Sequence, residues 1–229
     1  MSKSTSVSVL GAKSDTMPAH MQKDAGMGNE GASGALATPM IKLLQQLSPE
    51  LRDVPGAKEG LLYNSVSKEL FESLFIVPIY MIHTFTVWRD KKKGGGKFGD
   101  HETEAAALAH IQTLEGSADN YVAQETHKHY VLILDGDSGE VKSPAIIYMK
   151  SSQLGPSRDW NTGIHNSRAA RFAKVWELGS KSEMSRNNET YANYVITDTG
   201  YWTPELVYEE AKALYQSISG KAHDEAEAA

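Results

Sequence analysis

The chain has 229 residues, which is enough for one domain with extensions or for two small domains. Its formal net charge is −6, so it is not a globally basic nucleic-acid coat, and binding of a polyanion would need a local cationic patch. No apolar run approaches the length of about 18 residues that a transmembrane helix needs. The absence of cysteine excludes disulfides, thiolate metal sites and cysteine nucleophiles. The first residues contain no apolar block typical of a signal peptide, so we expect a cytoplasmic protein.

The first part of the chain is poor in residues that form a core. Residues 1–38 are mostly Ser, Gly, Ala, Met, Lys and Asp, and every aromatic residue comes later, so we expect this segment to be disordered. Residues 39–59 are predicted to form a short amphipathic helix and a linker, because Pro39 suits a first helical position and Pro49 stops the helix. The apolar residues of this helix share one face: Met40, Leu43, Leu44 and Leu47.

The next part of the chain has the composition of β-strands. Residues 74–88 are rich in β-branched and aromatic residues, and Pro78 marks an edge or a bulge because proline cannot donate to a strand ladder. A turn-rich segment at 135–139 predicts a hairpin between two strands. The predicted strands are 60–66, 74–88, 126–134, 144–149, 173–180 and 191–197.

Three helices and an acidic tail complete the prediction. Residues 101–114 have apolar residues at helical spacing with Asp100 as the cap, and 157–168 is a second helix. Thr203 and Pro204 open a closing helix, and residues 220–229 are expected to be an acidic flexible tail. The folded core would then be 60–219, mainly β with inserted helices (α+β). Because strands and helices do not alternate regularly, we expect a partly open antiparallel barrel and not a doubly wound fold.

The most unusual segment runs from Trp88 to Gly99. It places five cations and one acid between two aromatic residues in an otherwise acidic protein. A single-stranded nucleic-acid groove needs this combination, because cations track the phosphates and rings stack on the bases. The alternative is a solvated surface hairpin that lysine keeps soluble. Further basic and aromatic residues follow at Arg158, Trp160, Tyr130 and Tyr148, and each ring has core packing as its alternative.

Other motifs point to no enzyme and no cofactor. Gly94, Gly96 and Gly99 match a dinucleotide fingerprint, but three lysines separate them from the preceding strand, so we do not expect a nucleotide there. His127 and His129 share a strand face and could chelate a metal, but no third ligand is evident, so no metal site is predicted. No nucleophile elbow or spaced carboxylate pair is present. We therefore expect a non-enzymatic protein.

The motifs also carry a resemblance to a family. The strings IVPIYMIHTFTVWRDKKKGGGKFGDH, THKHYVLIL and SPAIIYMKSSQLGPSRDWNTGI resemble those of small bacteriophage proteins over residues 60–170. These proteins are similar to phage single-stranded DNA-binding proteins, which implies an OB-fold-like barrel. The terminal aromatic residue found in many such proteins is missing from this chain.

The resemblance and the residues together predict a sequence-tolerant single-stranded DNA-binding protein of phage DNA replication or recombination, in the cytoplasm of an infected bacterial host. Its partners would be single-stranded DNA and, through the acidic tail, replication or recombination proteins; self-association is left open and no membrane is involved. The alternative is a virion structural or assembly protein without nucleic-acid activity. The predicted DNA-binding residues are Trp88, Arg89, Lys91, Lys92, Lys93, Lys97, Phe98, Tyr130, Tyr148, Arg158 and Trp160.

Overall fold

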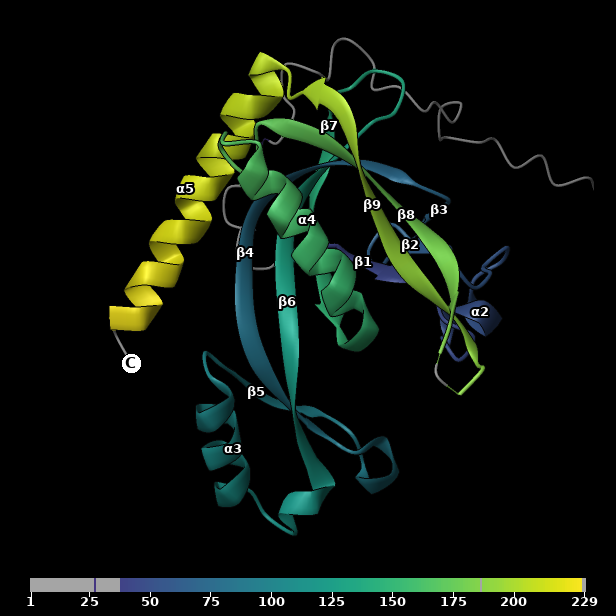
Figure 1. The fold of residues 1–229 in the computed structure, drawn as a ribbon, viewed down its shortest axis with the longest axis vertical. Coiled ribbons are helices and arrows are strands. Elements are labelled where there is room, and N and C mark those ends of the chain that lie inside the picture. Colours follow the sequence, from purple (N-terminus) through teal and green to yellow (C-terminus); the bar gives the residue numbers. More distant parts are fainter. Residues whose placement is uncertain (1–26, 28–37, 186, 228–229) are drawn as a thin grey trace, which may run out of the picture. The chain divides into compact units, whose positions relative to one another are not determined.

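A computed structural model describes residue 27, residues 38–185 and residues 187–227 (Figure 1). The segment predicted to be disordered, 1–38, lies almost entirely outside the described residues. From Thr38 onward the chain forms one compact unit. The folded domain therefore begins at about residue 38 and not at residue 60.

The unit is built on one continuous, curled sheet. Its strand order is β3-β2-β1-β7-β6-β4-β8-β9, with β5 attached to β4, and it forms an open half-barrel. All pairs are antiparallel except β1 with β7, which is parallel. The predicted mainly β, OB-like class with inserted helices is confirmed. The strands are β1 (Met40–Leu43), β2 (Leu62–Asn64), β3 (Leu70–Phe71), β4 (Leu74–Arg89), β5 (Lys97–His101), β6 (Tyr121–Leu134), β7 (Val141–Lys150), β8 (Lys174–Met184) and β9 (Thr190–Trp202).

The helices are α2 (Glu50–Asp53), α3 (Glu104–Thr113), α4 (Leu154–Asn166) and α5 (Glu205–Glu227). Thr103, and not Asp100, caps α3, because its hydroxyl accepts a hydrogen bond from the backbone N–H of Ala106. The backbone of α5 stays helical to Glu227, so the segment predicted to be a flexible tail continues this helix. Short 3-10 turns lie at Lys91–Lys93, Ala118–Asn120 and Ser151–Gln153. Among the described residues, no helix is long and apolar enough to span a membrane.

The helix predicted at 39–47 was wrong, because this segment contains strand β1. Its residues pair with β2 and β7, and Ile41 and Leu43 are buried in the core. Beyond the strand, the Gln45 side chain donates to the carbonyl of Ala192 at 2.9 Å and accepts from its N–H at 3.2 Å. Partners far along the chain therefore override a helical hydrophobic pattern that is only local.

The sheet has two covered faces with separate cores. Helix α4 lies over the face to which Val131 and Ile133 point, and α5 packs on the opposite face with Leu132 and Leu134 (Figure 1). This alternation is the two-residue period of strand β6. The strand register shifts at Pro78, where β4 pairs with β6, so the predicted bulge is confirmed. The ends of β4 and β6 extend as a ribbon that carries β5 and α3 (Figure 1).

Candidate nucleic-acid interface

A pocket of about 610 Å³ opens where β1 and β7 part. Strand β1 pairs with β7 only at Met40 and Ile41, whereas β7 continues to Lys150. A volume of several hundred Å³ is typical of ligand sites. The pocket is lined by Met40, Ile41, Lys42, Leu43, Gln45, Ser48, Pro49, Glu50, Thr86, Trp88, Lys97, Thr126, Tyr148, Lys150, Gln153 and Tyr194.

Two of the predicted aromatic residues, Trp88 and Tyr148, line this pocket. Both side chains are half-buried, so each ring has a covered part and an accessible part. The ammonium of Lys150 lies 4.9 Å from the ring centroid of Trp88, and that of Lys128 lies 6.0 Å from the ring centroid of Tyr148. Each accessible ring is therefore accompanied by a cation, as a site for a base and its phosphate requires.

The other cations of the pocket are held in ion pairs. Lys42 lies 3.0 Å from Glu50, and Lys97 pairs with Asp100. Burial acts to raise the pKa of Asp100, but hydrogen bonds from Lys97 and Thr86 outweigh it and hold the pKa below its usual value. Three lysines and one glutamate line the pocket, and Asp100 pairs with one of these lysines.

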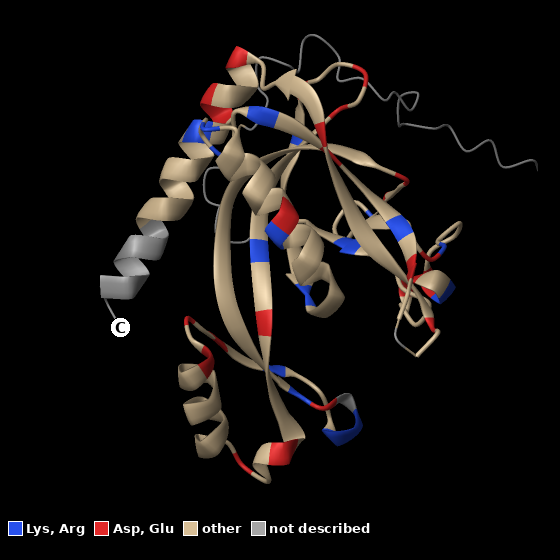
Figure 2. Ribbon diagram, in the orientation of Figure 1, with Lys and Arg blue, Asp and Glu red and all other residues tan. Residues whose placement is uncertain are grey.

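The lysine-rich loop lies beside the pocket. It joins β4 to β5, and Lys97 pairs across the two strands with Trp88. Figure 2 shows its cations at the tip of this hairpin. Lys92 and Lys93 are exposed there, and the side chain of Lys91 is outside the described part. The backbone at Gly94–Gly96 has φ between +64° and +113°, which only glycine adopts readily, so the three glycines shape this turn.

Several predicted residues lie away from the pocket. Phe98 packs edge-on against Tyr121 in a small core with α3, and Tyr130 lies against the core beneath α5. Trp160 is only 2% exposed and cannot stack on a base. The prediction that it stacks was wrong, because its apolar position on α4 faces the core. The guanidinium of Arg89 lies 5.7 Å from the ring of Tyr121.

Arg158 was predicted to contact phosphates, but the structure pairs it with a carboxylate. Its guanidinium donates to both oxygens of Glu125 at 3.0 Å. The predicted site is therefore divided: Trp88, Lys97 and Tyr148 line one pocket with the loop lysines nearby, whereas Phe98, Tyr130, Arg158 and Trp160 serve other contacts.

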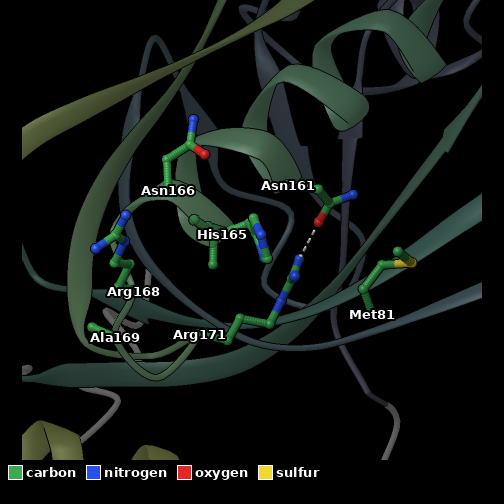
Figure 3. A pocket seen from close by; sticks show the side chains of 8 residues that line it. Met81, Asn161, His165, Asn166, Arg168, Ala169 and Arg171 are labelled. Atoms are coloured by element: carbon green, nitrogen blue, oxygen red, sulfur yellow. Dashed lines mark hydrogen bonds between the residues drawn. The ribbon is translucent and has the colours of Figure 1, made fainter.

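A wider cavity of about 880 Å³ lies on the α4 face and contains none of the predicted residues. Met81, Asn161, Ile164, His165, Asn166, Arg168, Ala169 and Arg171 line it (Figure 3). Burial lowers the pKa of Arg171 to about 10, and its guanidinium donates to the Asn161 side chain at 2.8 Å. This arginine is therefore engaged within the protein.

Behind that cavity lies a buried polar chain that the sequence did not predict. His127 and His129 point to the same face, as expected from their spacing, and both contact the Ser157 hydroxyl at 2.6 and 2.7 Å. Arg171 donates to Nδ1 of His129 at 3.1 Å. Because arginine only donates, a neutral His129 carries its proton on Nε2 and donates to Ser157. The spacing of the two histidines was the sequence signal for this group of hydrogen-bonded side chains, but the sequence did not identify Ser157 and Arg171 as their partners.

The family model described as Pam3 phage gp34-like protein matches residues 10–224. No curated protein and no solved structure matches the chain. The matched range includes the curled sheet, the lysine-rich loop and helix α4. The resemblance to bacteriophage proteins is thus confirmed at the level of the family, and the chain belongs to the Pam3 phage gp34-like family of phage proteins.

Proposed function

We propose that this protein binds single-stranded DNA with little sequence preference and acts in phage DNA replication or recombination. The observation that carries the proposal is the pocket between β1 and β7, on which Trp88, Tyr148 and Lys97 converge. The three residues span 60 positions of the sequence, and the fold brings them together. They supply aromatic rings for base stacking and a cation for the phosphates, the two kinds of contact that a single strand needs.

The arrangement explains how such binding would occur. A base entering the pocket would stack on Trp88 or Tyr148, and stacking on an aromatic ring contributes about 1–3 kcal/mol per base. The phosphates on either side would meet Lys97 and the exposed loop lysines Lys92 and Lys93. Lys97 would exchange its partner Asp100 for a phosphate, so the net gain from this lysine is smaller than from an unpaired one.

The test is a tryptophan-fluorescence titration with oligo-dT at low salt, followed by back-titration with sodium chloride. We expect quenching that salt reverses. Trp160 and Trp176 are buried and Trp202 does not line the pocket, so the signal should come from Trp88. Trp88→Phe should remove the quenching while keeping most of the affinity, measured by fluorescence anisotropy of a labelled oligonucleotide. Trp88→Ala should lose both.

The matched control is Trp202→Phe, because Trp202 is exposed on β9 and does not line the pocket. This variant should keep both the quenching and the affinity. Absence of binding by the unaltered protein, in fluorescence and in anisotropy, would overturn the proposed function. Binding that Trp88→Ala leaves intact would exclude the pocket as the site.

One observation favours a second function, that of a virion structural or assembly protein. Tyr201, Trp202 and Leu206 are 72%, 63% and 88% exposed and lie within six residues at the junction of β9 and α5. Large apolar side chains exposed together are typical of protein–protein contacts. Light scattering with and without oligonucleotide separates the two functions. A defined oligomer that Leu206→Ser disrupts, combined with no effect of DNA, would favour the assembly protein.

A further inference from the structure

We propose that His83, Glu125 and His127 form a binding site for a divalent transition-metal ion, with Zn²⁺ as the favoured cation. The sequence predicts no metal here, because His127 and His129 lack an evident third ligand. The fold supplies two ligands that sequence spacing does not reveal: His83 pairs across strands with His127, and Glu125 lies two residues earlier on β6. The three side chains therefore share one face of the sheet.

The geometry of the three groups fits one small cation. Oε1 of Glu125 lies 3.3 Å from Nε2 of His83 and 3.4 Å from Nε2 of His127, and each of the three residues offers a ligand atom within 4.8 Å of those of the other two. Ligand atoms on a tetrahedral zinc ion, with bonds of about 2.0–2.1 Å, are separated by about 3.3–3.4 Å. Both distances between a histidine nitrogen and the Glu125 oxygen match this ligand–ligand separation. They are longer than a charge-assisted hydrogen bond of about 2.7–2.9 Å.

The residues behind the site hold His127 in place. Its Nδ1 atom contacts the Ser157 hydroxyl at 2.6 Å, which leaves Nε2 directed to Glu125. The Ser157 oxygen has two lone pairs and a rotating proton, so it can accept from His127 as well as from His129 when a metal occupies Nε2. Such an outer contact orients a ligating histidine in known metal sites.

A bound metal ion must displace Arg158 from at least one oxygen of Glu125. Its guanidinium bonds both oxygens of Glu125, yet its side chain is 60% exposed. It can therefore leave one oxygen and turn to solvent without disturbing the core. Two histidines and one carboxylate are the ligands of several three-residue zinc sites, which leave a fourth position for water. Here that position would lie on the side of His83, whose side chain is 45% exposed.

The experiment is a Zn²⁺ titration of the full, tag-free chain by isothermal calorimetry, repeated with Co²⁺ to record its visible absorption. We expect one ion per chain. His83→Ala and Glu125→Gln should each weaken the affinity at least about tenfold, since even changes behind the ligands cost that much in known sites. Arg158→Gln should tighten binding, because it frees the carboxylate. His165→Ala is the matched control and should change nothing, because His165 is exposed on α4 outside the site.

A thermal midpoint for His83→Ala equal to that of the unaltered protein would show that the loss is not unfolding. An unchanged Zn²⁺ affinity in His83→Ala would overturn the proposal. So would binding that survives His83→Ala but disappears in His110→Ala, because it would assign the ion to the pair formed by His101 and His110, whose ring nitrogens lie 2.8 Å apart. Neither result depends on whether the protein binds DNA.

Discussion

The two faces of strand β6 use polar residues in opposite ways. On one face Lys128 stands beside the rings of Tyr130 and Tyr148, next to a pocket open to solvent. On the other face, His127 and His129 are buried and linked through Ser157. The polar groups on the open face can exchange their partners for a ligand, whereas His127 and His129 must keep their contacts with Ser157, because an unsatisfied buried group is costly.

The largest effect on stability is expected from a substitution on the buried face of β6. Ser157→Ala removes the hydroxyl shared by His127 and His129 and leaves a ring nitrogen of each without a partner. At about 1–3 kcal/mol for each of the two unsatisfied buried groups, we expect a loss of about 2–6 kcal/mol in the free energy of unfolding. Urea denaturation measures it. Tyr148→Phe removes a hydroxyl from the open face and should lower the free energy of unfolding by less than about 0.5 kcal/mol. Equal losses in the two variants would contradict the difference between the two faces.

Packing of α4 on the buried face can be tested with two glycines of the same helix. A Cβ atom at Gly163 would lie 2.9 Å from Cη2 of Trp176, a buried ring packed against Trp160, whereas at Gly155 it would meet nothing within 4 Å. Gly163→Ala should therefore be less stable than Gly155→Ala by about 1–3 kcal/mol, the usual cost of overpacking. Thermal unfolding of the pair compares them directly. A Gly163→Ala protein as stable as its counterpart would show that α4 can move away from the sheet.

The buried histidines should also make stability depend on pH. Burial holds the pKa of His129 well below its ordinary value, and the charges of Arg171 and His127 act in the same direction. Burial also lowers the pKa of His127, together with the charge of His83. Unfolding lets both titrate near pH 6.5, so the unfolded chain takes up protons first and stability falls as the pH drops below about 6.5.

The free energy of unfolding changes with pH by at most about 1.4 kcal/mol per pH unit for each histidine. The free energy of unfolding, measured in EDTA between pH 7.5 and 5.5, should fall less steeply in His129→Gln than in the unaltered protein. His165→Gln, at an exposed position, should keep the original slope. A His129→Gln protein with the original slope would mean that His129 does not titrate on unfolding in this range.

The smallest effect on stability is expected on the open face. Lys92→Ala with Lys93→Ala should change the free energy of unfolding by less than about 0.5 kcal/mol, because both side chains are exposed. If the loop contacts DNA, the slope of log affinity against log salt should decrease by about 1.4, or about 0.7 per lost phosphate contact. The control is Lys181→Ala with Lys212→Ala, on β8 and α5. An equal decrease in both double variants would indicate nonspecific attraction.

The sequence predicted the elements whose signals are local. The β-branched run 74–88, the proline bulge at Pro78 and the opening of α5 at Thr203 and Pro204 needed no distant partner. Strand β1 was missed because the spacing of Met40, Leu43 and Leu44 also fits a helix, and only pairing with β7 decides between them.

The candidate sites follow the same rule. The loop that carries Lys92, Lys93 and Lys97 was recognisable as a charged, glycine-rich run between aromatic residues. The ligand set of His83, Glu125 and His127 was not, because 42 residues and a strand register separate His83 from Glu125. The burial of Trp160 could not be read from its sequence neighbours either, because it depends on how α4 is rotated against the sheet.

The long-range attachment of β1 has a consequence for how the chain acquires its fold. Gln45 and Ala192, which exchange two hydrogen bonds, are separated by 147 residues. Contacts this distant form late, since a large loop must be closed before they contribute. During synthesis β1 therefore leaves the ribosome well before β7 and β9 exist, with Ile41, Leu43 and Leu44 still unburied. The interval until those strands arrive is the period in which a nascent chain of this protein is most exposed to aggregation.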